Sequence, residues 1–417
     1  MKISFVCAGW RELARSMPKL WSFLYFGGFS SQRDSLPLGN LQLVISTHLE
    51  LSQQHTLDFE VALYAPIKPE IFEFLLKPIV ANANRWRDVA LRLPIDIFLQ
   101  QDLAPVKGNL SLLRKLALSS NGNSWDASAL DAFEIAPSLR SLRLISGVPT
   151  NLRLPWKQIS NHTIEYSSLS TALRALSSTT EATHVTLLQC DQLESTSTQN
   201  IIIHSLRSLS IVINRKNPGF YYWFKWLTLP RLNHLEILGD ESLAPESSSH
   251  VPEYFSSFLS RSSCTITSLS LVGLAIGDVN TVSILSSLTS LSTLTIHELK
   301  YWKTNKMISA NLLNALTVDL GSGFSPTKAK ICRHLEHLDL CFHGTFSAKW
   351  VIDAINSRWI PVPKYAALLG VDSIKSVRIQ VIMSKDAKYF DMKELDEAMG
   401  LCKAAGLKFY SSPKFLT

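Results

Sequence analysis

The stretch CRHLEHLDLCFH, residues 332–343, brings together two cysteines and three histidines, the residue types that bind zinc. Structural zinc sites take these ligands in pairs, with the spacings C-x2–4-C and H-x3–5-H. Here the two residue types interleave on a predicted strand, where neighbouring side chains point to opposite faces. The pattern favours strand packing over metal binding, and we expect no metal and no cofactor.

The sequence contains none of the motifs that mark the common enzyme classes. G-x-S-x-G, G-x4-G-K-[ST], G-x-G-x-x-G and H-E-x-x-H are all missing. The 11 histidines and 34 acidic residues will place some pairs together by chance. We therefore expect no catalytic residues and predict a protein that is not an enzyme.

The composition bears on several further classes of protein. The chain has 417 residues, of which 46% are hydrophobic and 18% charged, which is enough for a large core. Its net charge of +7 is spread thinly, whereas nucleic-acid binders concentrate basic residues on one face. No run approaches the ~18 apolar residues of a membrane span, and the 6 cysteines are scattered without a C-x-x-C pair. We expect no nucleic-acid or membrane partner, and a location in the cytoplasm or nucleus.

One pattern, L-x-x-L-x-L, recurs along the chain. Its fourth and sixth positions are apolar in every copy, which places them on one face of a short strand. Segments between the copies, such as LSTALRALSS (169–178), carry apolar residues at helical spacing. The twelve copies lie 21 to 39 residues apart and start at residues 86, 113, 139, 161, 182, 206, 232, 266, 291, 313, 335 and 374.

One strand and one helix in roughly 20–29 residues form the unit of a leucine-rich repeat. Each unit exposes an apolar face that only its neighbours bury, so the fold class is predicted to be α/β, a leucine-rich-repeat solenoid. We expect irregular repeats over residues 56–382, with a curved, mostly parallel sheet and helices on its convex side. A linker or N-terminal cap over 25–55 precedes them, and a C-terminal helical cap over 383–417 follows. The helices and strands of an ordinary α/β domain are the alternative interpretation of the same leucines.

The two faces of the predicted strands carry different residues. Because positions four and six face the core, positions three, five and seven must face the concave side. Small Ser and Thr residues are frequent there, which suits a protein or peptide ligand better than a small molecule. Simple solvation of an exposed sheet face is the competing interpretation. The charged and histidine residues that we predict on this partner-binding face are His184, His234, Glu236, His297, Asp319, His337, Asp339 and Arg378.

The N-terminal stretch VCAGWRELARSMPKLW (6–21) predicts a short amphipathic helix that ends before Pro18. It resembles the C-terminal half of an F-box, in which a helix V-C-x-x-W-R-x-x-A is followed by P-x-L-W. The segments FLSRSSCTITSLSL (258–271), WLTLPRLNHLEIL (226–238) and INSRW (355–359) resemble the F-box/leucine-rich-repeat proteins abundant in mushroom-forming fungi. The residues that match the F-box pattern are Val6, Cys7, Trp10, Arg11, Ala14, Pro18, Leu20 and Trp21.

This resemblance implies a partner and a role. It makes residues 1–24 the C-terminal part of an F-box, and the chain the non-catalytic substrate-recognition subunit of a Skp/cullin/F-box ubiquitin ligase. The target protein would bind on the concave face of the repeats. The residues that the resemblance assigns to binding of the Skp adaptor are Val6, Trp10, Leu13, Ala14, Pro18, Leu20 and Trp21.

The resemblance departs from a full F-box at one point. The Leu-Pro-x-Glu segment and the first helix of an F-box do not precede Met1, so we expect weak or absent binding of the Skp adaptor. We also expect Trp10, Leu13 and Trp21 to pack partly on the first repeat. The alternative function is a ubiquitin-independent leucine-rich-repeat interaction scaffold that lacks a working F-box.

Overall fold

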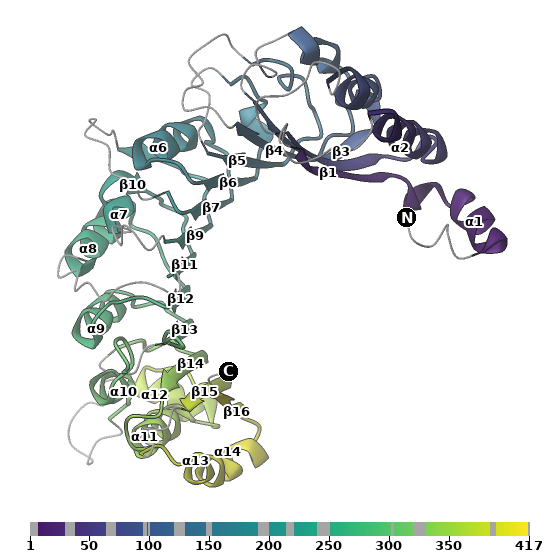
Figure 1. Ribbon diagram of the computed structural model, residues 1–417. Coiled ribbons are helices and arrows are strands. Elements are labelled where there is room, and N and C mark those ends of the chain that lie inside the picture. The colour runs from purple at the N-terminus through teal and green to yellow at the C-terminus, as the bar shows by residue number, and fades with distance from the viewer. Residues whose placement is uncertain are drawn as a thin grey trace. The chain divides into compact units, whose positions relative to one another are not determined.

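The computed structural model describes residues 7–29, 38–63, 72–94, 98, 101–120, 130–146, 152–190, 200–213, 221–239, 251–301, 304–319, 331–383 and 389–415. The chain divides into two compact units, Met1–Val185 and Thr186–Thr417. Fourteen parallel strands follow chain order and alternate with helices (Figure 1). This arrangement is typical of an α/β repeat solenoid.

The first unit begins with α1 (Ala8–Arg15) and the short helix η2 (Pro18–Leu20). It continues with β1 (Phe23–Phe29), α2 (Leu38–Leu51), β2 (Leu57–Leu63), η3 (Phe72–Leu76), α4 (Lys77–Val80), η4 (Ala83–Arg85), β3 (Trp86–Leu93), η5 (Gln101–Val106), β4 (Lys115–Ser120), β5 (Ser141–Ile145), η6 (Trp156–Gln158), β6 (Asn161–Glu165) and α6 (Leu169–Ser178). Each strand from β1 to β6 pairs in parallel with the next. The division between the units falls within β7 (His184–Leu188).

The second unit repeats the alternation of strand and helix. Its elements are β8 (Ile201–Ile202), β9 (Ser208–Val212), α7 (Tyr222–Trp226), β10 (Leu227–Thr228), β11 (His234–Leu238), α8 (Val251–Ser262), β12 (Ser268–Val272), α9 (Asp278–Ser286), β13 (Thr293–His297), α10 (Ala310–Leu316), β14 (His337–His343), α11 (Lys349–Arg358), α12 (Pro363–Leu369), β15 (Ser376–Met383), α13 (Met392–Ala398), α14 (Gly400–Ala404) and β16 (Lys408–Phe415). β9 and β11 to β16 pair in parallel in chain order, while β8 and β10 form a separate pair. Helices α8 to α11 lie on one side of these strands (Figure 1). None of the helices in the described ranges is both long enough and apolar enough to cross a membrane.

The leucines of the repeat pattern form the core of each unit. Leu142 is buried in β5 of the first unit. In the second unit the equivalent leucines stand in register on adjacent strands, so each packs against the next. Complete burial of one such side chain stabilises the fold by about 1.5–3 kcal/mol. These leucines, each at most 4% exposed, are Leu209, Leu235, Leu269, Leu294 and Leu338.

Eleven of the twelve predicted strands are present, and the one predicted from the copy at residue 313 is wrong. That copy lies in α10, which Ser309 caps by accepting hydrogen bonds from the backbone N–H groups of Asn311 and Leu312. Leu313 and Leu316 are both buried in this helix. A three-residue spacing of leucines fits one face of a helix as well as the repeat pattern, so the sequence period was misleading here. β13 consequently pairs directly with β14.

Five of the described strands lie where no strand was predicted: β1, β2 and β16 of the long sheet, and the short strands β8 and β10. β1 pairs with β2 and follows the F-box-like residues, within a segment that lacks the L-x-x-L-x-L pattern. β16 pairs with β15 and comes after α13 and α14, in the segment 383–417 that was expected to be a helical cap. The C-terminal segment therefore extends the parallel sheet of the second unit as well as adding helices.

α11 buries a charged guanidinium near its C-terminal end. Arg358 is 1% exposed and donates hydrogen bonds to the backbone oxygens of Leu316, Cys332 and Ile331, the last two at 2.7 and 2.8 Å. Burial lowers the pKa of Arg358 to about 10, which leaves it charged at neutral pH. This side chain thereby ties the end of α10 to residues 331–332.

A buried carboxyl binds the backbone of residues 306–308, just before α10. The Oε1 atom of Glu298 accepts hydrogen bonds from the backbone N–H groups of Lys306, Met307 and Ile308, at 2.9, 2.7 and 2.8 Å. Burial raises the pKa of Glu298 to about 7, although these three bonds favour the charged form. The other oxygen, Oε2, has no hydrogen-bond partner among the described residues.

In the first unit, a histidine occupies a core position of the repeat. His162 in β6 is in register with Leu142 and is 1% exposed. Its Nδ1 atom lies 3.3 Å from the hydroxyl of Thr179, and its Nε2 atom has no partner within the described part of the chain. Burial lowers the pKa of His162 to about 3, so the ring is neutral.

Candidate functional site

The open face of the second unit is the sheet surface opposite the core leucines. Every second side chain of the strands points to this face, and in β9 and β11 to β13 all of these side chains are half-buried. Parallel register aligns them in rows across neighbouring strands. The row through the third repeat position is Ser208, His234, Ser268, Thr293, His337, Ser376 and Lys408, and the row through the fifth is Ser210, Glu236, Ser270, Thr295, Asp339, Arg378 and Tyr410.

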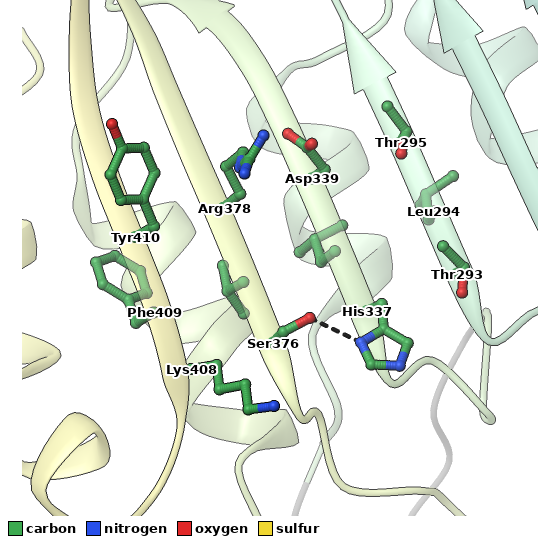
Figure 2. A pocket seen from close by; sticks show the side chains of 12 residues that line it. Thr293, Leu294, Thr295, His337, Asp339, Ser376, Arg378, Lys408, Phe409 and Tyr410 are labelled. Atoms are coloured by element: carbon green, nitrogen blue, oxygen red, sulfur yellow. Dashed lines mark hydrogen bonds between the residues drawn. The ribbon is translucent and has the colours of Figure 1, made fainter.

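The open face is hollowed over β13 to β16 by a groove of about 400 Å³ (Figure 2). Small side chains on β13 leave room above the sheet, while longer ones on β15 and β16 border it. The side chains of the two rows that line this groove are Thr293, Thr295, His337, Asp339, Ser376, Arg378, Lys408 and Tyr410.

The groove carries its cations on β15 and β16 and a carboxylate on β14. The guanidinium of Arg378 lies 5.6 Å from the centre of the Tyr410 ring, within the range of a cation–π interaction. Asp339, the register partner of Arg378, accepts a hydrogen bond at Oδ1 from Nε2 of His297 at 2.9 Å. Lys408 lies near the Ser376 end of the groove (Figure 2).

Two serine–histidine contacts on the open face raise the question of nucleophilic catalysis. Nδ1 of His337 lies 2.7 Å from the hydroxyl of Ser376, and a second such contact joins His234 and Ser268 at 2.9 Å. Both pairs connect neighbouring strands of one row, so the repeat itself generates them. Oε2 of Glu336 lies 3.9 Å from Nε2 of His337, while Oε1 of the same carboxylate binds Nζ of Lys375 at 2.6 Å. A catalytic base needs a partner that orients it, so these pairs fit cross-strand hydrogen bonding better than chemistry.

The stretch CRHLEHLDLCFH supplies β14 and the loop before it. Cys332, Cys341 and His343 are buried, whereas His334 is exposed and His337 half-buried. Within the ranges that the structure describes, no cluster of three or more His, Cys, Asp or Glu side chains is arranged to hold a metal ion.

Six of the residues predicted for partner binding lie together on the open face of the second unit. His184 instead begins β7 and belongs to the first unit, where its Nδ1 atom is 2.9 Å from the hydroxyl of Thr183. The placement of Asp319 on a strand was wrong, because the copy at 313 is the helix α10 and Asp319 follows it. The six that share the open face are His234, Glu236, His297, His337, Asp339 and Arg378.

The N-terminal helix packs on its own unit through one side only. Trp21 is buried and donates from Nε1 to the backbone oxygen of Ala14 at 2.6 Å. Its ring meets the ring of His48 edge-on at 5.1 Å. Trp10 and Leu13 are 52% and 54% exposed, so the expectation that they pack on the first repeat was wrong. Ala14 is the one buried residue of α1, which leaves the side of the helix that carries Trp10 and Leu13 uncovered.

The remaining residues assigned to adaptor binding lie beside this helix. Pro18 and Leu20 form η2 and are half-buried, while Met17 just before them is exposed. Val6 lies outside the described residues. Trp10, Leu13 and Met17 are therefore exposed apolar side chains on α1 and directly after it, and Phe23 and Tyr25 of β1 are exposed as well.

Sequence reasoning missed three residues of the groove, Lys408, Phe409 and Tyr410. All three lie on β16, in the segment that was predicted to be helical. The sequence signal that could have predicted this strand was the alternation of Leu407 and Phe409 directly after Gly406. In the structure Gly406 has a φ of +105°. Two apolar positions are too few to distinguish a strand from a helix end.

No protein-family model matches this chain, and no curated protein matches it either. The structure defines the class of the chain as an α/β repeat protein with a long parallel sheet. Its open face and the uncovered side of α1 are the features from which a function can be inferred.

Proposed function

We propose that the protein is a non-catalytic interaction protein that binds a target protein on the open face of its second unit. The observation that supports this proposal is the pair of aligned rows across seven strands, hollowed over β13 to β16. The rows present hydroxyl, imidazole and charged groups at the strand spacing of about 4.8 Å. Small-molecule sites are concave and mostly apolar, so this open polar surface suits a protein segment better.

Filling the rows with large side chains tests this proposal. Ser270→Arg with Thr295→Arg places two long side chains in the fifth-position row, while Ser283→Arg with Ser287→Arg adds the same charge on the exposed side of α9 and its end. Proteins captured from cell extract by the unaltered chain should be lost with the first variant and kept with the second. Hydrogen exchange of the captured complex should slow in β11 to β16. Equal capture by both variants, or protection confined to the helices, would contradict the proposal.

We further propose that the target is recognised for a Skp/cullin/F-box ubiquitin ligase, with α1 binding the Skp adaptor. The resemblance of residues 6–21 to an F-box supports this role, and so does the uncovered stripe of Trp10, Leu13 and Met17. An eight-residue helix is unstable in water by itself, so a partner that covers this stripe would stabilise it. Ubiquitin transfer would take place on other subunits, which requires no catalytic group in this chain.

Calorimetric titration with a purified Skp adaptor tests the second proposal. We expect weak binding, with a Kd in the micromolar range or above, equivalent to roughly −8 kcal/mol or less favourable. Trp10→Ala with Leu13→Ala should abolish it, whereas Leu368→Ala with Leu401→Ala, which truncates two exposed leucines of the second unit, should not. Failure of the unaltered chain to bind any Skp adaptor would favour the alternative, a ubiquitin-independent interaction scaffold.

A further inference from the structure

The charged side chains of the open face are sorted by strand. The carboxylates of Glu236 and Asp339 lie on β11 and β14. On β15 and β16, register and alternation place Arg378, Lys408 and Lys414 on the open face, and all three are cations. A partner segment that lies over these two strands therefore meets only positive charge.

The carboxylates in this region pair with other groups. Asp339 binds His297 at 2.9 Å, Glu336 binds Lys375 at 2.6 Å, and Asp396 lies 3.5 Å from Lys403. Among the described residues, no carboxylate forms an ion pair with the three cations on the open face of β15 and β16. Tyr410 contributes to holding the guanidinium of Arg378 over the groove, through their 5.6 Å contact. The groove thus offers cations that form no ion pair with a carboxylate of the described residues.

The spacing of these cations is close to that of an extended chain. Arg378 and Lys408 lie on adjacent strands in rows two residues apart, so their Cα atoms are separated by about 6.6 Å along the strand and about 4.8 Å across it, about 8 Å in all. Same-side residues of an extended segment, i and i+2, are about 6.6 Å apart. Two carboxylates at this spacing can each approach one cation, whereas a single phosphate concentrates its charge at one point.

We propose that the groove over β15 and β16 binds an extended acidic segment of a partner protein, with carboxylates at i and i+2 against Arg378 and Lys408. This inference rests on the proposed protein-binding role of the open face and specifies the chemistry of its ligand. The hydroxyl of Ser376 also lines this part of the groove, where it contacts Nδ1 of His337. Asp339 on β14 would repel a carboxylate of the partner segment that shifted toward β13. This repulsion favours a position of the acidic residues over β15 and β16.

Pools of decapeptides provide the probe, with uncharged residues randomised at all but positions five and seven. The fixed pair is Asp/Asp, Asn/Asn or Lys/Lys, and a fourth pool carries one phosphoserine at position five. Each pool is passed over the immobilised full chain at low salt, and the retained fraction is measured by mass spectrometry. Arg378→Ala with Lys408→Ala removes the two cations, and Lys349→Ala with Lys364→Ala removes two exposed cations from helices of the same unit.

We expect the Asp/Asp pool to be retained at least tenfold more than the Asn/Asn and Lys/Lys pools. The preference should disappear in the Arg378/Lys408 variant, persist in the Lys349/Lys364 variant and weaken as salt is added. Equal retention of Asp/Asp and Asn/Asn, survival of the preference without the two cations, no retention at all, or a stronger preference for the single phosphoserine would overturn the inference. Equal retention that Ser270→Arg with Thr295→Arg abolishes would leave the proposed function standing while this inference fails.

Discussion

Replacing Arg358 by methionine should strongly destabilise the second unit. The guanidinium supplies hydrogen bonds to three backbone oxygens, those of Leu316, Ile331 and Cys332. Methionine keeps an unbranched apolar stem but has no donor, so all three oxygens lose this partner. They lie at the end of α10 and just before β14, the two segments that Arg358 joins.

The magnitude follows from these three oxygens. The oxygen of Cys332 also accepts from the backbone N–H of Leu335 at 3.3 Å, so the oxygens of Leu316 and Ile331 are the two left without a donor among the described residues. A buried acceptor left without a donor costs about 1–3 kcal/mol, which gives about 2–6 kcal/mol for two. Removal of the guanidinium also removes the cost of burying a charge, which is visible in the lowered pKa of about 10 for Arg358. We therefore expect a net loss of about 3–5 kcal/mol, similar to removing one partner of a buried ion pair.

Thermal unfolding followed by circular dichroism measures this loss. For 150–250 residues, 1 kcal/mol shifts Tm by about 2–4 °C, so the expected decrease is about 6–20 °C. Arg358→Lys keeps the charge but presents its donors from a single point, so its Tm should lie between those of the wild type and Arg358→Met. Arg333→Met provides a matched control, because Arg333 is exposed in the same segment, and should change stability by about 0.5 kcal/mol at most.

Two results would refute this reasoning about Arg358. If Arg358→Met melts within about 1 °C of the wild type, the three oxygens do not depend on the guanidinium. If Arg333→Met is as damaging as Arg358→Met, the effect comes from the charge of the segment rather than from the buried hydrogen bonds.

Three further predictions concern buried titratable groups and the N-terminal helix. The pKa of Glu298, about 7 against an ordinary 4.5, means that the folded state holds the proton more tightly, so stability should fall by up to about 3 kcal/mol as pH rises from 4.5 to 7. Urea titrations at successive pH should show this slope removed by Glu298→Gln; an unchanged slope would contradict the assignment. His162 gives stability the opposite dependence on pH. Its pKa of about 3 lies below the ordinary 6.5, so stability is lost as pH falls below 6.5. His162→Leu should remove that loss and raise the free energy of unfolding at pH 7 by about 1 kcal/mol, whereas a less stable variant would show that the ring is needed for packing. Trp21→Ala should cost the first unit about 3–5 kcal/mol, while Trp10→Ala should stay within about 0.5 kcal/mol in thermal unfolding; equal losses would show that α1 is covered on both sides.

The core could be predicted from the sequence because one spacing recurs. In each strand, burial of the fourth and sixth repeat positions is what allows neighbouring repeats to stack, so the period reports the packing directly. Leu235 and Leu269 illustrate this, since both are buried and lie in register. β1 and β16 escaped prediction as edge strands, because an edge strand packs against one neighbour only and needs less of the pattern. β2 escaped it for another reason, since its buried Leu57, Phe59 and Val61 alternate without the leucine spacing of the repeat.

The open face could be predicted in part. Alternation along a strand decides which side chains share a face, and it placed Glu236, Asp339 and Arg378 correctly on the surface opposite the core. It does not decide which residues become neighbours, because that depends on the order and register of the strands. Tyr410, which contacts Arg378, comes from a strand that had not been predicted.

The helix at residues 310–316 decides which side chains the groove contains. Had the copy at 313 formed a strand between β13 and β14, His297 and Asp339 would lie two strands apart, about 9.6 Å across the sheet. Because β14 is instead the direct neighbour of β13, Nε2 of His297 lies 2.9 Å from Oδ1 of Asp339. The same adjacency places Thr295 beside Asp339 and brings both into one groove with the cations of β15 and β16. By capping α10, Ser309 therefore helps to determine which residues become neighbours on the open face, although Ser309 itself does not line the groove.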